Sequence, residues 1–185
     1  MRSMTAGNYV IPGDVGFCNA VRRILLTEIR TWAPCSVRMH RNTTCQTDEF
    51  LAHRIGLIPF RRIGNGDTMT LDAMGPCVVY ARDLTSPAFE AVHGDIEIMR
   101  LAAGNELKLT VEFDFKQAQD HARYAECAAV GMEKVDANHC RITFTTNNDR
   151  HPTEVMVEAL DHLNAHIDRA LHALSEPRVP LKSFC

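Results

Sequence analysis

The feature that most constrains the fold is a narrow stripe of apolar residues near the C-terminal end of the chain. Pro152, which suits the first turn of a helix, comes just before the stripe. A stripe this narrow is typical of a helix that packs on another helix, within the chain or in a partner. The apolar residues recur four, three, four, four and three positions apart: Met156, Leu160, Leu163, Ile167, Leu171 and Leu174.

A second helix is expected near the N-terminus, over about residues 16–30. Asp14 is a candidate N-cap, because its carboxylate can accept hydrogen bonds from the free N–H groups of the first turn. The residue before Pro34 is pushed out of helical geometry, so the helix is expected to end before this proline. Residues 36–40 alternate as a strand does. The buried stripe of this helix is expected to comprise Val21, Ile24, Leu25 and Ile29.

The middle of the chain predicts one short helix and several strands. Thr47 is a candidate N-cap for a helix over residues 48–54, and Gly56 is a candidate terminator. Residues 61–76 contain several glycines and are expected to form a loop. Strands are expected at residues 77–80, 96–99, 107–115 and 141–145, of which 107–115 alternates most regularly.

Composition and charge indicate a globular protein without an overall affinity for nucleic acid. Apolar residues make up 45% of the 185 residues and charged residues 23%, which argues against disorder. The net charge of −3 provides no positive field that would attract nucleic acid. No apolar run approaches the roughly 20 residues that cross a bilayer, and the N-terminus lacks the apolar core of a signal peptide. We therefore expect an intracellular protein, in the nucleus or the cytoplasm.

The cysteines and histidines do not form a recognisable metal or catalytic motif. The seven cysteines are scattered without a Cys-x-x-Cys pair, so neither a zinc ribbon nor an iron–sulfur cluster is expected. His162 and His166 have metal-binding spacing but lack a nearby third ligand. His53 and His121 are not paired with an orienting acid or an oxyanion-forming glycine turn. We expect free thiols in a reducing compartment, and neither a cofactor nor a catalytic residue.

Four separated runs resemble the α-like assembly subunits of multisubunit RNA polymerases, in particular the archaeal D subunit and the eukaryotic third-largest subunit. The run from Asn19 to Leu26 resembles the signature helix of this family. The segment from Asn42 to Pro59 is similar to one that distinguishes the archaeal and eukaryotic branch. Residues 80–84 resemble a strand motif of the family's insert domain, and residues 120–124 resemble its His-Ala-Lys-Trp motif, with Arg123 and Tyr124 as substitutes.

The resemblance implies an α+β fold made of a discontinuous dimerisation module and a mostly β insert domain. Helices pack on a small antiparallel sheet in the module, which is expected over residues 8–41 and 131–176. The insert is expected over residues 42–130, and residues 177–185 form a C-terminal tail. The function implied is that of a non-catalytic scaffold of a DNA-dependent RNA polymerase.

The resemblance also implies partners and the residues that contact them. The apolar stripe from Met156 to Leu174 would pack on a smaller α-like subunit, of the L or eleventh-subunit type. The platform so formed would seat the two large catalytic subunits and small zinc-bearing subunits. DNA would be contacted only through the complex. The contact with the second-largest subunit would involve Arg22, Arg23, Asp48, Glu49, His53 and Arg54.

Some departures and alternatives remain open from the sequence. The insert lacks the zinc loop or ferredoxin module that many members carry, and the N-terminal strand is short, which would suit a compact or viral version acting in a virion or viral factory. Arg22 and Arg23 could also be solvated helix charges, and the apolar stripe could be core. Two other functions are a free-standing homodimeric binding module and, less favoured, a hydrolase that uses cysteine and histidine.

Overall fold

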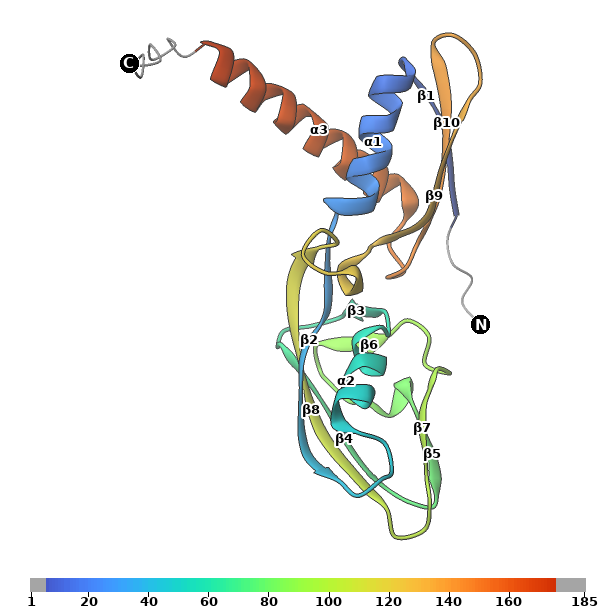
Figure 1. Cartoon of the computed structure of the whole chain (residues 1–185), viewed down its shortest axis with the longest axis vertical. Coiled ribbons are helices and arrows are strands. Elements are labelled where there is room, and N and C mark those ends of the chain that lie inside the picture. Colours follow the sequence, from blue (N-terminus) through green and yellow to red (C-terminus); the bar gives the residue numbers. More distant parts are fainter. Residues whose placement is uncertain (1–5, 176–185) are drawn as a thin grey trace, which may run out of the picture.

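The computed structural model describes residues 6–175, which form two bodies stacked end to end (Figure 1). The helical body consists of β1, α1, β9, β10 and α3; the strand-rich body consists of β2 to β8 with α2 and η1. The short helix η2 lies between them. The elements in chain order are β1 (Ala6–Pro12), α1 (Val15–Thr27), β2 (Arg30–Asn42), α2 (Asp48–Gly56), β3 (Phe60–Arg62), β4 (Thr68–Met74), β5 (Cys77–Tyr80), η1 (Ala81–Asp83), β6 (Phe89–Ala91), β7 (Glu97–Leu101), β8 (Glu106–Gln117), η2 (Ala122–Tyr124), β9 (Cys127–Lys134), β10 (His139–Thr146) and α3 (Pro152–Ser175).

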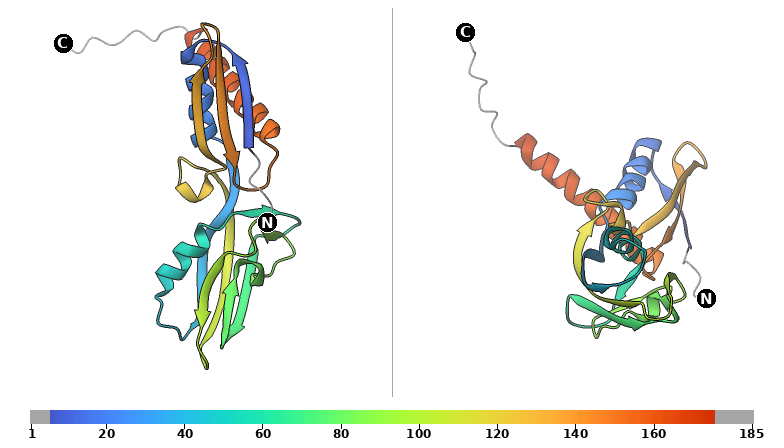
Figure 2. Two further views of the ribbon diagram at one scale, coloured as in Figure 1. Left: turned by 90° about the vertical axis from the view of Figure 1, so that its right-hand side faces the viewer. Right: turned by 60° about the horizontal axis from the view of Figure 1, so that its bottom comes forward.

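In the helical body, two helices cover one face of an antiparallel sheet with the strand order β1-β10-β9 (Figure 2). Helix α1 begins as the sequence predicts, because the Asp14 carboxylate accepts a 2.7 Å hydrogen bond from the Phe17 N–H. The apolar faces of α1, α3 and the sheet meet in a core that includes Leu25, Phe144 and Met156. Burial of these apolar faces therefore holds the two helices of the helical body against the sheet.

In the strand-rich body, the sheet β2-β8-β4 is the largest element, accompanied by the two-stranded sheets β3-β6 and β5-β7. Its separate core includes Leu51 of α2, Leu109 of β8 and Phe89 of β6. Phe89 stacks on Phe113 with ring centroids 4.0 Å apart. The N-cap of α2 is confirmed, because the Thr47 hydroxyl accepts a hydrogen bond from the Phe50 N–H.

Strand β2 begins at one of the two chain connections between the bodies, directly after α1, whereas the other connection runs from β8 through η2 to β9. Strand β2 pairs antiparallel with β8 from Arg30 to Asn42, so it contributes to the sheet of the strand-rich body over its whole length. We expected residues 30–41 to belong to the dimerisation module, together with the first helix. The C-terminal tail expected at 177–185 lies outside the described residues. The fold class itself is α+β, as expected.

The structure corrects three local predictions. Helix α1 was expected to continue to about residue 30 but ends at Thr27, and the segment before Pro34 is part of strand β2. An extended backbone is favourable for the residue before a proline, and an edge strand with a bulge tolerates the proline itself. Residues 61–76 are largely strand, because Met69 and Leu71 alternate with exposed positions. Gly56 is the last residue of α2 and has no positive φ, so its conformation does not terminate the helix.

Strands β6 and β9 were not predicted from the sequence, whereas the resemblance implied a short N-terminal strand, which is β1. Strand β9 has Ala129 at a φ of 51°, near the register shift between Thr143 and Thr145 in its pairing with β10. That irregularity disrupts the simple alternation by which a strand is recognised. None of the helices within residues 6–175 combines the length and the apolarity that a bilayer crossing requires.

Candidate interaction surfaces

The two adjacent arginines of α1 lie in different environments. Arg22 is half-buried, and its Nε donates a 3.0 Å hydrogen bond to Oδ1 of Asn19. Arg23 is exposed, and its backbone carbonyl accepts a 2.9 Å hydrogen bond from the Thr27 hydroxyl. Successive residues of an α-helix point about 100° apart, so the two guanidinium groups address different directions. A partner that binds both arginines would contact two adjacent faces of α1.

Helix α2 presents charged and apolar side chains together. Asp48, Glu49, His53 and Arg54 are all exposed. The Arg54 guanidinium lies 5.9 Å from the ring centroid of Phe50, and its Nη2 donates a 2.6 Å hydrogen bond to the carbonyl of Glu97. Phe50 and Leu57 are 47% and 55% exposed. The sequence indicated the charges of this surface but not its two exposed apolar side chains.

A hollow of about 270 Å³ extends this surface beside the end of α2. Its lining is mostly apolar and includes Leu57, Ile58 and Ile96, with Arg54 and Glu97 at the edge. An apolar hollow bordered by charges is typical of a protein-binding surface rather than of a solvated helix face. The α2 surface therefore offers both apolar burial and polar contacts to a partner.

The helices α1, η2 and α2 lie along the same side of the molecule (Figures 1 and 2). Arg123 of η2 contacts the strand-rich body there, because its Nη1 donates a 2.8 Å hydrogen bond to the carbonyl of Pro34 in β2. Nδ1 of His121 accepts hydrogen bonds from the N–H and the Nε of Arg123, at 3.1 and 3.2 Å, and so orients this arginine. A Cβ added to Gly56 would lie 3.5 Å from Arg123 Nη1. The motif at residues 121–124 thus joins the end of α2 to β2.

The apolar stripe of α3 divides into a covered and an uncovered part. Met156 is 4% exposed, and Leu160 and Leu163 pack partly against the core of the helical body. Farther along, α3 extends beyond α1 and away from the sheet (Figure 1). The exposed fraction of the last three members rises along the helix, to 46%, 60% and 77%: Ile167, Leu171 and Leu174.

A groove between α1 and α3 begins where the stripe becomes uncovered. It has a volume of about 280 Å³, and Arg23, Ile24 and Thr27 line its α1 side. Leu163 and His166 line its α3 side. Beyond this groove, the exposed part of the stripe forms an apolar face that can accept a helix of another protein.

Comparison with known proteins decides the family. The family model for the RNA polymerase Rpb3/Rpb11 dimerisation domain matches residues 13–167. The chain belongs to this family, the α-like assembly subunits of DNA-directed RNA polymerase. The family predicted from the four sequence runs is thereby confirmed, and so is the non-catalytic nature of the subunit.

Three archaeal relatives, each named DNA-directed RNA polymerase subunit Rpo3, illustrate the similarity. The Methanocaldococcus jannaschii protein is 30% identical over 170 residues, which cover 90% of this chain and 88% of that protein. The Pyrococcus horikoshii protein is 33% identical over 131 residues, covering 63% and 51% of the two chains. The Halobacterium salinarum protein is 32% identical over 130 residues, covering 66% and 52%. The alignments thus span about half the length of the last two relatives.

The cysteines within residues 6–175 of this α-like subunit do not form a nucleophilic site. Burial raises the pKa of the Cys18 thiol to about 11 and that of the Cys127 thiol to about 12, so both stay protonated at neutral pH. The thiols of Cys18, Cys35 and Cys77 donate to backbone carbonyls. The alternative of a cysteine and histidine hydrolase therefore has no support. Within the described residues, no group of three His, Cys, Asp or Glu side chains is placed to hold a metal ion.

A cleft of about 590 Å³ between the two bodies was not predicted from the sequence. Its lining includes Trp32, whose indole ring carries the Arg62 guanidinium 4.2 Å from its centroid. Arg61 spans the cleft by donating a 3.0 Å hydrogen bond to Asp149 and a 2.7 Å one to Glu90. The lining comes from four distant segments of the chain, so no local sequence pattern could identify it.

Proposed function

We propose that the chain is a scaffold subunit of a DNA-dependent RNA polymerase that pairs with a smaller α-like subunit. The pair would form the platform that seats the two large catalytic subunits. The observation that carries this proposal is the apolar stripe of α3, which is buried at Met156 and exposed from Ile167 to Leu174. An apolar face of this length in water favours a partner that covers it, since burial contributes roughly 25 cal/mol per Å² of apolar surface.

The side formed by α1, η2 and α2 supports a contact with the second-largest subunit. Arg22, Arg23 and the four charged positions of α2 offer guanidinium and carboxylate groups for charge-assisted hydrogen bonds. The exposed Phe50 and Leu57 add apolar contact area on the same side. A contact along this whole side would hold both bodies and fix a large subunit in one orientation.

The remaining partners and the location follow from the same proposal. The largest subunit and small zinc-bearing subunits would join the platform, and DNA would be reached only through the complex. The chain itself would bind neither zinc nor an iron–sulfur cluster. Such a subunit would act inside the cell, in the nucleus or the cytoplasm.

The experiment that tests the proposal is purification of the tagged full-length chain at native expression levels, followed by mass spectrometry of the proteins bound to it. We expect a smaller α-like subunit and both large polymerase subunits. Light scattering then measures the size of the chain with and without the small subunit. A stable homodimer that ignores the small subunit would support the binding-module alternative instead.

The assignment of the two surfaces predicts how the arginines of α1 behave. Replacing Arg22 and Arg23 together by Ala should leave pairing with the small subunit intact and weaken recruitment of the second-largest subunit, by roughly tenfold or more if charge-assisted bonds are lost. Quantitative co-purification measures both. The exposed Arg38 on β2, distant from α1, provides a control as Arg38→Ala. Loss of the small subunit with the large one retained would show that the two surfaces are assigned the wrong way round.

A further inference from the structure

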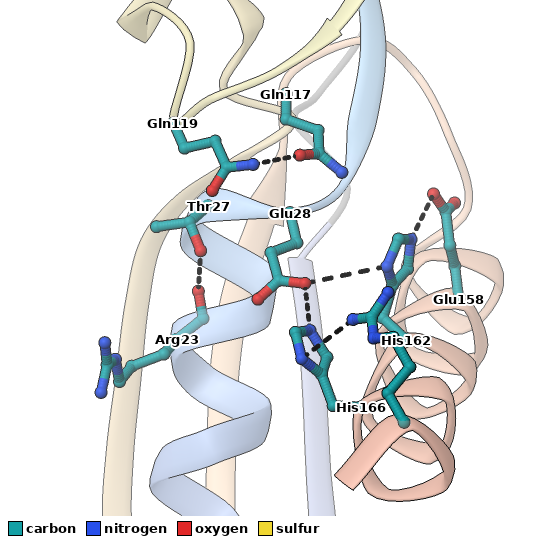
Figure 3. Close-up of polar contacts among 9 residues, drawn as sticks. Arg23, Thr27, Glu28, Gln117, Gln119, Glu158, His162 and His166 are labelled. Atoms are coloured by element: carbon teal, nitrogen blue, oxygen red, sulfur yellow. Dashed lines mark hydrogen bonds and ion pairs between the residues drawn. The ribbon is translucent and has the colours of Figure 1, made fainter. Parts of the chain in front are cut away.

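A carboxylate–histidine cluster connects α1 to α3 at the edge of the groove (Figure 3). Glu28 follows the last residue of α1, and its Oε2 lies 2.6 Å from Nε2 of His166. The same oxygen lies 3.9 Å from Nδ1 of His162. On its other side, His162 lies 3.9 Å from Oε1 of Glu158. The Glu28 side chain is only 22% exposed, so its contact with His166 is partly shielded from water.

The hydrogen bonds assign the proton of His166. Nη2 of Arg169 lies 3.1 Å from Nδ1 of His166, and a guanidinium group has only donors. Nδ1 of His166 is therefore the acceptor, and Nε2 carries the proton that is donated to Glu28. Glu28 thus acts as an acceptor that binds a specific tautomer of His166. An amide oxygen at the same position could accept this hydrogen bond as well.

The backbone that carries Glu28 is held in place from several directions. The Glu28 N–H donates a 2.9 Å hydrogen bond to the carbonyl of Ile24, and the Thr27 carbonyl accepts one of 3.2 Å from the Gln119 N–H. The Thr27 hydroxyl donates to the carbonyl of Arg23 (Figure 3). The Glu28 carboxylate therefore extends from a point fixed to both α1 and the segment that follows β8.

His166 occupies the position on α3 where the helix leaves the core. Every residue from Ile167 to Ser175 is exposed. Leu174 follows His166 by eight positions, which is about 12 Å along the helix axis. A tilt of about 10° at His166 would displace Leu174 by about 2 Å, enough to disturb the packing of side chains against a partner helix.

We propose that Glu28 is a positioning residue for subunit pairing, because it fixes the direction in which the exposed half of α3 leaves the helical body. The inference rests on the proposed function and adds a residue outside the apolar stripe to the determinants of pairing. Before the partner binds, the Glu28–His166 contact holds α3 in the orientation that the interface requires. Preorganisation of this kind increases affinity, because less conformational freedom is lost on association.

Three variants test this role in the full-length chain. Glu28→Ala removes the acceptor, whereas Glu28→Gln retains an acceptor oxygen. The control is Glu133→Ala, which removes a comparable surface pair, because Glu133 accepts a 2.7 Å hydrogen bond from Arg141 between β9 and β10. The small α-like subunit is obtained by co-purification with the parent chain, and its affinity for each variant is then measured. We expect Glu28→Ala to weaken pairing by roughly threefold to tenfold, and the other two variants to pair as the parent does.

A second measurement reports the orientation of α3 without a partner. Spin labels are attached through a non-natural amino acid at Ala173 and Thr143, because the seven cysteines exclude thiol labelling. The distribution of distances between the labels should broaden in Glu28→Ala and stay narrow in Glu28→Gln. A merely stabilising contact would lower the melting temperature without broadening this distribution.

The two proposals fail in distinguishable ways. If the parent chain binds the small subunit and Glu28→Ala binds it equally well, or if the distance distribution of Glu28→Ala stays narrow, the positioning role is wrong and the scaffold function stands. If the parent chain binds no small α-like subunit, the proposed function itself is wrong.

Discussion

Glu126 is a carboxyl group buried at the junction of the two bodies. Only 1% of the residue is exposed, and no hydrogen-bond partner of its Oε1 is found. Its Oε2 accepts a 3.1 Å hydrogen bond from Asn148, whose amide also contacts the Thr31 hydroxyl. Burial raises the pKa of the Glu126 carboxyl above its ordinary value of 4.5, although Thr31, Arg150 and Asn148 partly oppose this shift. The residue thus links three segments of the chain and destabilises the fold when it is charged.

Glu126→Gln should therefore change the pH dependence of stability. The folded state holds the Glu126 proton more tightly than the unfolded state, so the stability due to this residue is complete below pH 4.5 and decreases as the pH rises through the raised pKa. The Gln variant does not titrate. Its free energy of unfolding relative to the parent should increase between pH 5 and pH 8, as urea denaturation at each pH would measure. A difference that is constant over this range would contradict the assigned burial.

At the residue scale, sequence reasoning succeeded where the determining contacts are local. The caps Asp14 and Thr47 bind N–H groups three residues away, so short sequence windows contain all the information. It failed for Glu126 and Trp32, whose environments are made by residues far along the chain. The side chains at the junction of the two bodies were therefore not predicted.

Along the apolar stripe of helix α3, the first residues pack inside the chain and the last residues are free to bind a partner. Its first turns complete the core of the helical body, whereas Ile167, Leu171 and Leu174 remain exposed. The periodicity predicted the helix and its apolar face. It did not show where burial ends, because that depends on how far α1 and the sheet extend beside α3.

Replacing Leu171 by Glu should separate the stability of α3 from its binding. Leu171 is 60% exposed, so the free energy of unfolding of the free chain should change by no more than about 0.5 kcal/mol. Pairing with the small subunit should be lost or weakened by roughly a hundredfold, because a charge would enter an apolar interface. Thermal denaturation and a binding assay measure the two quantities.

The control for this variant is Ala165→Glu. Ala165 is exposed and lies about 200° from Ile167 around the helix, on the opposite face. We expect it to pair normally. Equal loss of pairing in both variants would mean that the apolar stripe does not define the contact face.

The strands show the same division between local and distant causes. The segment 107–115 alternates regularly and was predicted, because β8 is the central strand of its sheet and buries one face. Strand β2 was predicted only in part, since Pro34 is a helix terminator in isolation and an acceptable residue in an edge strand. The choice between these outcomes is made by pairing with β8, about 80 positions away in the sequence.

At the scale of the whole molecule, two apolar cores are joined by two chain connections, from α1 to β2 and from β8 to β9, and by polar contacts. The cores share no residues. The contacts between the bodies include Arg61 with Asp149 and the Glu126 network, in which Asn148 contacts Thr31 of β2. Regions with separate cores open as separate cooperative units more readily than a single core does.

Core substitutions should therefore act mainly on the body that contains them. Leu109→Ala in the strand-rich body and Leu25→Ala in the helical body each remove a side chain that is 1% exposed, and each should cost about 2–5 kcal/mol. The single tryptophan, Trp32, packs against Phe89 of the strand-rich body, so its fluorescence reports on that body. We expect Leu109→Ala to shift the fluorescence transition more than the helical circular dichroism, and Leu25→Ala to do the reverse. Coincident shifts would show a single cooperative unit.

The sequence by itself determined the family, the α+β class, the caps and the amphipathic character of the helices, because motifs, caps and periodicity are properties of neighbouring residues. Only the tertiary structure decided that the stripe of α3 is half-covered, that Glu28 binds His166, and that Glu126 is buried between the bodies. Each of these depends on which distant segments meet, and burial and charge pairing follow from that meeting rather than from local order along the chain.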